Sequence, residues 1–374
     1  MVGSSSPVGV ADRVRLVVLY GGRSAEHDVS CVSARHVVEA VDPGRYDLRL
    51  IGITTDGRWL DTTAAALDGA GSASPPDALP SPDALGDLAE ELEAVSAMGR
   101  EGPDRSGDPL VVLPLVHGPM GEDGTLQGLL ELAGLPYCGP GVAGSAAAMD
   151  KVMAKALLEA AGLPQARYLA RHESELGPGL GAEVEARLGW PVFVKPANMG
   201  SSIGISKVKD PGGLDGALEM ARRYDDHLVI EESVTGREIE IGVLGWPALH
   251  TSVPGEVRPS RDFYDFDDKY RAGTAGLEIP ARLADEVVAE MSRLAVAACR
   301  ALQVDSMARV DFFFEEDGRG LLINEVNTIP GFTPISMYPR MWAASGVPYR
   351  QLIDALVDQA LRRAERRSRF ETGH

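Results

Sequence analysis

The chain has 374 residues, of which 44% are hydrophobic and 24% are charged, and its formal net charge at pH 7 is −19. These proportions are typical of a globular protein with two or three domains. The acidic balance argues against nucleic acid or an anionic membrane as the main partner, because both attract basic surfaces.

The sequence also lacks the usual signs of export. No apolar run reaches membrane-spanning length, and the first ten residues lack the basic and apolar regions of a signal peptide. Three cysteines, Cys31, Cys138 and Cys299, lie far apart without metal-ligand spacing, which indicates free thiols in a reducing compartment. We therefore expect a cytoplasmic protein.

The first part of the chain has the pattern of an α/β unit. A buried strand over residues 14–20 ends at Gly21-Gly22, and a helix is expected from about Asp28 to Val41. Strand, glycine turn and helix in this order open a nucleotide-fold-like unit, although the G-x-G-x-x-G spacing of a dinucleotide site is absent. Residues 61–108 are rich in Ala, Pro, Gly, Ser and Asp, and we interpret them as a surface insertion with one short helix.

A second buried strand covers residues 110–116 and runs into a turn-rich loop that begins at His117. Because open α/β sheets bind ligands beyond the carboxyl ends of their strands, we expect Glu26 and His117 to face one crevice. For His117 alone, a loop histidine with local hydrogen bonds is the simpler interpretation. The leucine spacing after this loop predicts a helix that stops at Gly134.

A glycine-rich stretch marks the middle of the chain. A helix is expected over about 145–161, and the first domain boundary is placed near its start. An apolar strand then ends at Lys195, and a loop rich in Gly and Ser leads to a second strand that is expected to begin at about Ile203. Small residues let backbone N–H groups approach phosphate oxygens, and the lysine adds a positive charge. The spacing differs from a Walker A loop, and a hairpin without any ligand is the alternative.

Acidic residues follow the next predicted strand, residues 227–232, which delivers Glu231 and Glu232 to a turn ahead of Glu238. Carboxylates at this position could accept hydrogen bonds from adenine and ribose. Residues 254–276 combine glycines, charges and four aromatic side chains, a mixture typical of an active-site lid. Two further helices are expected, over about 283–302 and 348–367.

The stretch from Arg309 to Gly331 predicts a β-hairpin, because two runs rich in Val, Phe, Leu and Ile flank an Asp-Gly turn signal. If Asp311 lies opposite Glu325, side-chain alternation places Arg309 opposite Asn327 on the same face. Buried acids need partners, and oxygen ligands of this kind suit Mg²⁺ beside substrate phosphates. The alternative is an ordinary solvated face.

Seven motifs together resemble the D-alanine–D-alanine ligases of the ATP-grasp superfamily, in that family's order and over nearly the full chain. They are G-G-R-S-A-E-H-D-V-S (21–30), H-G-P-M-G-E-D-G-T-L-Q-G (117–128), M-D-K (149–151), V-K-P-A-N-M-G-S-S-I-G (194–204), F-Y-D-F-D-D-K-Y (263–270), R-V-D (309–311) and N-E-V-N-T-I-P-G-F-T (324–333). One departure is Phe266, which stands where the family often has Tyr.

The resemblance implies an α/β, ATP-grasp fold in which ATP lies between two α+β subdomains. The first domain would be an N-terminal Rossmann-like substrate domain over 1–144, which includes the insertion at 61–108. A central ATP-grasp subdomain would follow over 145–240. A C-terminal ATP-grasp subdomain over 241–374 would carry the lid loop at 254–276.

Carried over by motif position, the resemblance assigns roles to individual residues. The metal ligands would be Asp311, Glu325 and Asn327. The nucleotide site would be lined by Lys151, Lys195, Glu231, Glu232, Glu238, Phe263, Lys269 and Asn324. The catalytic groups would be Glu26 (for the first D-alanine's ammonium), Ser201 and Tyr270 (which latch the lid to Glu26), and Arg309 with the Gly331 amide (for the oxyanion). The substrate contacts would also include His117 near the first D-alanine and Ser336 at the second D-alanine's carboxylate.

The implied reaction is the ATP-dependent ligation of two D-alanines through a D-alanyl phosphate, for peptidoglycan precursor synthesis. Two Mg²⁺ ions would take part, with Mn²⁺ and K⁺ as further candidate cations, and the family suggests a homodimer. Neither nucleic acid nor a membrane is an expected partner.

Three alternatives stay open. A D-alanine–D-lactate or D-alanine–D-serine ligase would share most motifs, but resistance enzymes of this kind typically carry a His where Tyr270 stands, and some lactate-making relatives carry Phe. Another ATP-grasp carboxylate–amine ligase would share the three metal ligands but neither the Glu26 loop nor the lid. A nucleotide-binding regulator without turnover would be expected to lack a metal ligand, whereas all three are present.

Overall fold

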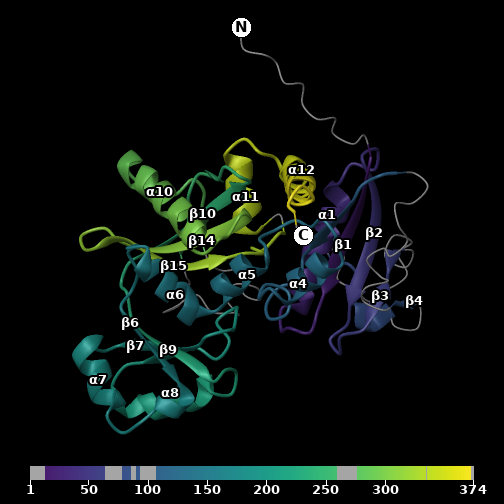
Figure 1. Cartoon of the computed structure of the whole chain (residues 1–374). Helices are drawn as coiled ribbons and strands as arrows, with labels where there is room; N and C mark the ends of the chain where they lie inside the picture. The colour runs from purple at the N-terminus through teal and green to yellow at the C-terminus, as the bar shows by residue number, and fades with distance from the viewer. Residues whose placement is uncertain are drawn as a thin grey trace.

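The computed structural model describes residues 13–63, 78–85, 90–92, 107–258, 276–333 and 335–371. Within these ranges the chain forms three sheets with helices packed on their faces (Figure 1). This arrangement confirms the predicted α/β class. None of the described helices combines the length and the apolar character needed to cross a membrane.

The first sheet has the strand order β4-β3-β2-β1-β5, and β1 pairs in parallel with both β2 and β5. Its strands are β1 (Val14–Gly21), β2 (Tyr46–Ile53), β3 (Trp59–Asp61), β4 (Glu90–Leu92) and β5 (Leu110–Pro114). Strands buried on both faces are continuous apolar runs, which is why β1 and β5 could be predicted. The helices that follow them are α1 (His27–Ala40) and α4 (Thr125–Leu132), both in the expected places.

The segment 61–108, which we expected to be an insertion, contributes to the edge of this sheet. Its strand β4 pairs antiparallel with β3, and a single 3₁₀ turn covers Pro82–Leu85. Most of the remaining segment lies outside the described residues, as does most of the lid loop predicted at 254–276.

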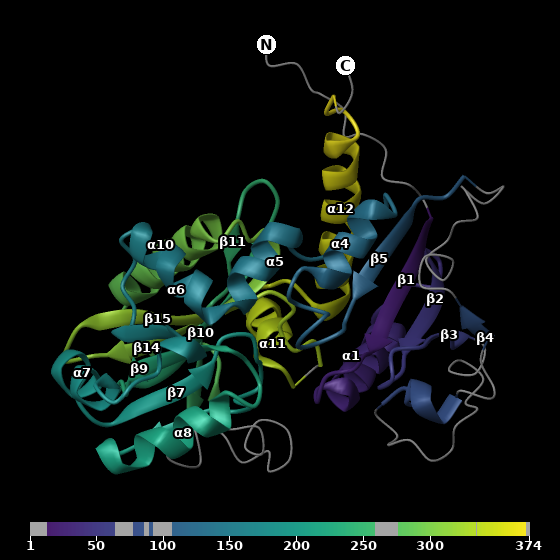
Figure 2. The same cartoon turned by 60° about the horizontal axis from the view of Figure 1, so that its bottom comes forward.

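The central sheet is antiparallel, with the order β6-β9-β7-β8. Its strands are β6 (Tyr168–His172), β7 (Val192–Pro196), β8 (Ser206–Val208) and β9 (His227–Glu232). The second strand of the glycine-rich hairpin thus begins at Ser206 rather than near Ile203, which leaves a longer loop after Lys195. Helices α7 (Leu180–Arg187) and α8 (Leu214–Ala221) pack their apolar sides on this sheet. Figure 1 shows both on the side turned away from β15, and Figure 2 shows the same for α8.

The third sheet follows the order β13-β12-β10-β14-β15, and β11 also pairs with β10. Its strands are β10 (Arg237–Gly245), β11 (His250–Thr251), β12 (Gly255–Arg258), β13 (Gly276–Glu278), β14 (Ser306–Glu315) and β15 (Gly320–Asn327). Helix α10 (Asp285–Ala301) packs its buried residues into the core of this sheet. The chain passes from the central sheet to this one between Glu232 and Arg237.

The helix predicted over 145–161 is two helices, α5 (Val142–Met149) and α6 (Lys151–Ala160). Asp150 separates them in an extended conformation, and its carboxylate caps α6 by accepting a hydrogen bond from the Met153 N–H at 2.9 Å. An aspartate at this position stabilises a helix N-terminus better than a helix interior. The break places Lys151 against the glycine-rich loop, where its backbone N–H donates to the Ala197 carbonyl at 3.1 Å.

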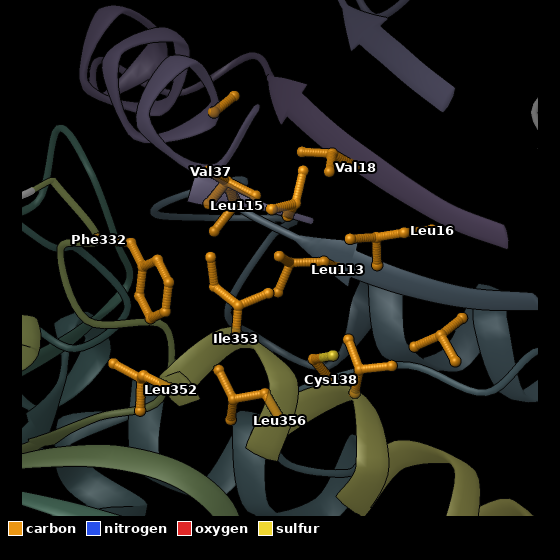
Figure 3. Packing of buried hydrophobic residues seen from close by; sticks show 14 of the residues in the cluster. Leu16, Val18, Val37, Leu113, Leu115, Cys138, Phe332, Leu352, Ile353 and Leu356 are labelled. Carbon is orange, nitrogen blue, oxygen red and sulfur yellow. The ribbon is translucent and has the colours of Figure 1, made fainter. Parts of the chain in front are cut away.

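The last helices, α11 (Met337–Ala344) and α12 (Tyr349–Arg367), complete the core of the first sheet. Leu352 and Ile353 of α12 belong to the same buried cluster as Leu16 of β1 and Leu113 of β5 (Figure 3). Removing such side chains from water supplies about 25 cal/mol per Å² of apolar surface. The two ends of the sequence therefore share one hydrophobic core, which fixes the first sheet against the third.

Candidate active site

The β14–β15 hairpin has the register that the sequence predicts. Asp311 pairs with Glu325, and Arg309 pairs with Asn327. A register irregularity follows immediately, between Asp311 and Phe312, and a bulge of this kind turns neighbouring side chains away from strict alternation.

Arg309 and Asp311 form the centre of a polar cluster on this hairpin. The guanidinium donates two hydrogen bonds to the Asp311 carboxylate, each at 2.7 Å, and lies 3.0 Å from Glu240 on β10. Asn327 donates a third hydrogen bond to Asp311 at 3.0 Å. Burial would lower the pKa of Arg309, but Asp311 and Glu240 raise it well above its ordinary value. The guanidinium thus lies between two acids, and Glu240 is a member of the cluster that the sequence did not reveal.

Three side chains on neighbouring elements form a second charged group. Glu231 of β9 accepts a hydrogen bond from Lys195 of β7 at 2.7 Å and forms an ion pair with Lys155 of α6. Glu231 is 1% exposed and Lys155 is 4% exposed. Burial would raise the pKa of Glu231, but the two lysines lower it to about 2.

Lys155 was missed by the sequence analysis, although a signal for it exists. It lies four residues after Lys151 on one helix, and side chains at this spacing project from the same face. Lys151 itself donates to the Met199 carbonyl at 2.6 Å, and burial lowers its pKa while the Glu325 charge opposes that shift. Lys151 therefore contacts the glycine-rich loop, while Lys155 and Lys195 converge on Glu231.

A cavity lies between the second group and Asn327 of the hairpin, while Arg309 and Asp311 are not among the residues that line it. Six predicted site residues line it, namely Lys151, Lys195, Glu231, Asn324, Glu325 and Asn327. They come from four elements that are far apart in the sequence, so the fold brings residues of separate motifs to one cavity. Glu122, from the loop after β5, lines the same cavity, and the sequence analysis did not single it out.

Glu232 and Glu238 are not among the residues that line this cavity. Glu232 points to the opposite face of β9 from Glu231, because neighbouring strand residues alternate. Its carboxylate accepts hydrogen bonds from Arg167, which precedes β6, and from Arg319 of the hairpin turn, at 2.7 and 2.5 Å. The structure therefore makes Glu232 an ion-pair link between the central and third sheets.

A second cavity, of about 300 Å³, lies on the other side of the glycine-rich loop. It is lined by Glu26 and shares Met199 and Gly200 with the first cavity, so the two are neighbours. The Ser201 hydroxyl donates a hydrogen bond to the buried Glu26 carboxylate at 2.5 Å. This contact links the first sheet to the central one, as the resemblance predicted for this pair.

The glycine-rich loop is held in an unusual backbone conformation. Ser201 and Ser202 both have positive φ, at 50° and 60°. Two successive non-glycine residues in the left-handed region cost of order 1–3 kcal/mol each, and such strain is concentrated at functional sites.

His117 is buried near Glu26, but it does not line either of these two cavities, so the prediction that both residues face one crevice is not confirmed for His117. Its Nδ1 lies 3.1 Å from the Ile329 carbonyl, and since a carbonyl only accepts, Nδ1 carries the proton. Burial lowers the pKa of His117, although the nearby Glu26 charge raises it. The imidazole is therefore neutral, and the negative charge of Glu26 remains available to a cationic ligand in the cavity.

Glu122 completes the acidic group around this crevice. It accepts a hydrogen bond from the Gly118 N–H at 2.6 Å. Burial and, next, the charge of Glu26 raise the pKa of Glu122 to about 8. Gly118 has a φ of +77°, and a Cβ there would lie 2.9 Å from a Glu26 oxygen, so only glycine fits between the two acids.

Two predicted residues follow the hairpin, namely Gly331, assigned to the oxyanion, and Ser336, assigned to the second D-alanine's carboxylate. Ser336 lies in the turn before α11, where its hydroxyl is 2.8 Å from that of Thr333. A Cβ on Gly331 would come within 2.9 Å of the Ser336 oxygen, so these two predicted residues are adjacent. Phe263, Lys269 and Tyr270 lie outside the described residues, and their roles stay predictions.

The hairpin residues fit Mg²⁺ by their chemistry. Asp311, Glu325 and Asn327 offer oxygen atoms of the kind that Mg²⁺ prefers. The 3.0 Å contact between Asn327 and Asp311 shows that two of these side chains already converge. No imidazole or thiol competes in this set, which suits a hard cation.

Comparisons with known proteins agree with this geometry. A family model described as "D-ala D-ala ligase N-terminus" matches residues 15–140, and one described as "D-ala D-ala ligase C-terminus" matches residues 157–358. The chain is 48% identical to a D-alanine--D-alanine ligase of Nocardia farcinica over 95% of this chain and 99% of that protein.

Two solved structures are also similar. The D-alanine-D-alanine ligase from Coxiella burnetii superposes with a TM-score of 0.82 at 34% identity, over 96% of this chain and 97% of that one. The VanG D-Ala:D-Ser ligase from Enterococcus faecalis superposes with a TM-score of 0.77 at 32% identity, over 93% and 99%. The chain therefore belongs to the D-alanine–D-alanine ligase family of ATP-dependent enzymes with the ATP-grasp fold.

Proposed function

We propose that this enzyme joins two molecules of D-alanine at the expense of ATP, for the synthesis of a peptidoglycan precursor. The observation that carries the proposal is the pair of neighbouring cavities. One holds the lysines and Glu325 of the hairpin, the other holds Glu26, and the strained glycine-rich loop contributes Met199 and Gly200 to both. A phosphate donor and a small amino acid can therefore meet across this loop.

The first cavity suits the nucleotide. Lys151 and Lys195 lie where they can neutralise phosphate oxygens, while Glu231 and Asn324 offer polar contacts to the rest of the nucleotide. Asp311, Glu325 and Asn327 would hold Mg²⁺. When bound, the ion would neutralise charge on the transferred phosphoryl group. The family's use of ATP supports this assignment, and Mn²⁺ in place of Mg²⁺ and an additional K⁺ are part of the proposal.

The second cavity suits the ammonium group of the first D-alanine, because the buried Glu26 carboxylate supplies the opposite charge beside a neutral His117. The carboxylate of this D-alanine attacks the γ-phosphorus, and the bond from the γ-phosphorus to the bridging oxygen of ADP breaks. The product is D-alanyl phosphate, a reactive acyl donor.

The neutral amine of the second D-alanine then attacks the acyl carbon, and inorganic phosphate leaves as the amine releases a proton. Arg309 and the Gly331 N–H would stabilise the oxyanion of this step, while Ser336 would bind the carboxylate of the second D-alanine. An oxyanion donor of this kind typically contributes about 10²–10³ in rate. The lid predicted at 254–276 would exclude water from the acyl phosphate.

Because the chain is also similar to a D-Ala:D-Ser ligase, the identity of the second substrate needs a direct test. D-Alanine, D-serine and D-lactate should be offered together with ATP and Mg²⁺, and the products quantified from about pH 6 to 9, because protonation of the acceptor amine varies over this range. We expect D-alanyl-D-alanine to predominate. Predominance of the D-serine product or of the depsipeptide would overturn the proposed specificity.

We further propose a homodimer in the cytoplasm, supported by family resemblance alone. Sedimentation equilibrium of the purified enzyme tests the dimer. A monomer at all accessible concentrations would contradict it.

A further inference from the structure

A group of metal-ligating side chains lies outside the active site, at the edge of the central sheet. His172 ends β6 and His227 begins β9, and the two are directly paired in the antiparallel register. Asp226 precedes His227, and the ligand atoms of the three residues all lie within 4.8 Å of one another. The side chains are 37%, 50% and 60% exposed for His172, His227 and Asp226 respectively, so an ion could enter from solvent.

The ligand atoms of this group lie close to one another. Oδ2 of Asp226 is 3.7 Å from Nε2 of His172, and Oδ1 of Asp226 forms a hydrogen bond of 2.9 Å with Nδ1 of His227. Ligand atoms on a tetrahedral Zn²⁺ at its usual bond lengths are about 3.3 Å apart, so a bound ion would replace this hydrogen bond and draw the three side chains together. The two imidazole rings are 4.9 Å apart and inclined by 69°, so they do not stack and can both turn toward a common point.

Ser174 provides a partner for the first imidazole. Its hydroxyl lies 2.7 Å from Nδ1 of His172. The Ser174 backbone N–H donates to the same nitrogen at 3.2 Å, so Nδ1 is an acceptor and the proton of the neutral ring lies on Nε2, on the side of Asp226. These contacts fix the orientation of the ring, and an ion that binds at Nε2 would move this proton to Nδ1 at the cost of the Ser174 N–H contact.

We propose that His172, Asp226 and His227 form a binding site for a borderline divalent transition-metal ion such as Zn²⁺. Two imidazoles and one carboxylate are ligands that Zn²⁺ accepts readily, whereas Mg²⁺ prefers oxygen ligands alone. The site is distinct in place and in chemistry from the hairpin acids, and it does not depend on the proposed ligase reaction.

The proposed site is connected by hydrogen bonds to the glycine-rich loop. The His227 carbonyl accepts a hydrogen bond from the Ala197 N–H at 2.9 Å. Asp225, next to the site, accepts one from the Asn198 N–H at 2.7 Å. An ion that links the ends of β6 and β9 therefore restrains the segment that leads into the loop, and we expect slower exchange of these two amide protons.

The test uses the untagged full chain, stripped of metal and then supplied with excess Mg²⁺ to occupy the hairpin site, without nucleotide. Zn²⁺ binding is measured by competition with a chromogenic chelator. We expect one Zn²⁺ per chain and no measurable binding to His172→Ala or His227→Ala. His250→Ala, an exposed histidine on β11, is the matched control and should bind as the wild type does.

Two results would overturn the proposal. One is the absence of Zn²⁺ binding to the wild type, and the other is binding that neither histidine substitution weakens, with the variants shown to be folded by their unchanged melting temperatures in the absence of Zn²⁺. Hydrogen exchange at Ala197 and Asn198 tests the connection. Slower exchange on adding Zn²⁺ to the wild type but not to His227→Ala supports it, and unchanged exchange in the wild type refutes it.

Discussion

Replacing Lys155 by methionine tests how the charge of Glu231 is held beneath the nucleotide site. The substitution removes one of two cations from a carboxylate that is 1% exposed, and it leaves the 2.7 Å contact with Lys195 in place. Breaking a buried ion pair by removing one partner typically costs about 3–5 kcal/mol. Because Lys195 remains, we expect the free energy of unfolding to fall by about 3 kcal/mol, at the lower end of that range.

The effect of Lys155→Met on stability should depend on pH. In the wild type the pKa of Glu231 is lowered to about 2, so its stabilising contribution is present above the unfolded-state pKa and is lost as pH falls toward 2. Without Lys155 the pKa of Glu231 in the folded state rises, so the variant loses less unfolding free energy as pH falls. The difference in unfolding free energy between wild type and variant should therefore be largest near neutral pH and shrink as pH falls below about 4.5.

Urea unfolding of the two proteins at several pH values measures this difference. Lys209→Met, at an exposed lysine, is the control and should change stability by less than about 0.5 kcal/mol. Combining Lys155→Met with Glu231→Gln should recover part of the loss, because the neutral amide needs no cation. The reasoning would be refuted if Lys155→Met lowered the unfolding free energy equally at every pH. It would also be refuted if the effects of the two substitutions on the unfolding free energy were additive in the double variant.

Three further substitutions test other parts of the account. Glu325→Gln should reduce turnover by roughly a thousandfold or more with an unchanged melting temperature, because the carboxylate charge serves the cation. Steady-state rates measure this, with Glu316→Gln in the hairpin turn as the control. Equal activity of the two variants would contradict the prediction. Glu122→Gln should stabilise the protein increasingly as pH rises from about 5 to 9, because the raised pKa of Glu122, about 8, means that its folded form resists ionisation; a pH-independent shift in melting temperature would contradict this. Arg363→Met should cost about 3–5 kcal/mol in urea unfolding, because the buried guanidinium donates to the Tyr137 and Gly139 carbonyls and to Asp305 at 2.7–2.9 Å; a loss below 1 kcal/mol would count against a role in joining the first and third sheets.

The sequence predicted the site best where chemistry and local geometry coincide. The hairpin is the clearest case, because a short turn and two-residue alternation set Asp311 opposite Glu325 without any tertiary information. Lys195 and the glycine-rich loop were equally recognisable, because a strand that ends in such a loop is a local pattern. The pairing of Ser201 with Glu26 came from family resemblance, since the two are 175 positions apart.

The sequence predicted less where tertiary packing decides. Glu231 and Glu232 look equivalent in the sequence, but alternation on β9 turns one into the cavity and the other toward Arg167 and Arg319. Glu240 was missed because its role depends on β10 lying beside β14. The break at Asp150 was available as a capping signal, yet the apolar periodicity on both sides predicted one continuous helix.

The most direct test of the proposed function is the stoichiometry of the reaction. The purified enzyme should be incubated with D-alanine, ATP and Mg²⁺, and ADP, phosphate and D-alanyl-D-alanine should be quantified in the same samples. The account predicts that one ADP and one phosphate form for each dipeptide and that all three products disappear without D-alanine or without Mg²⁺. Formation of ADP at the same rate without D-alanine, or ADP formed with no dipeptide, would contradict it.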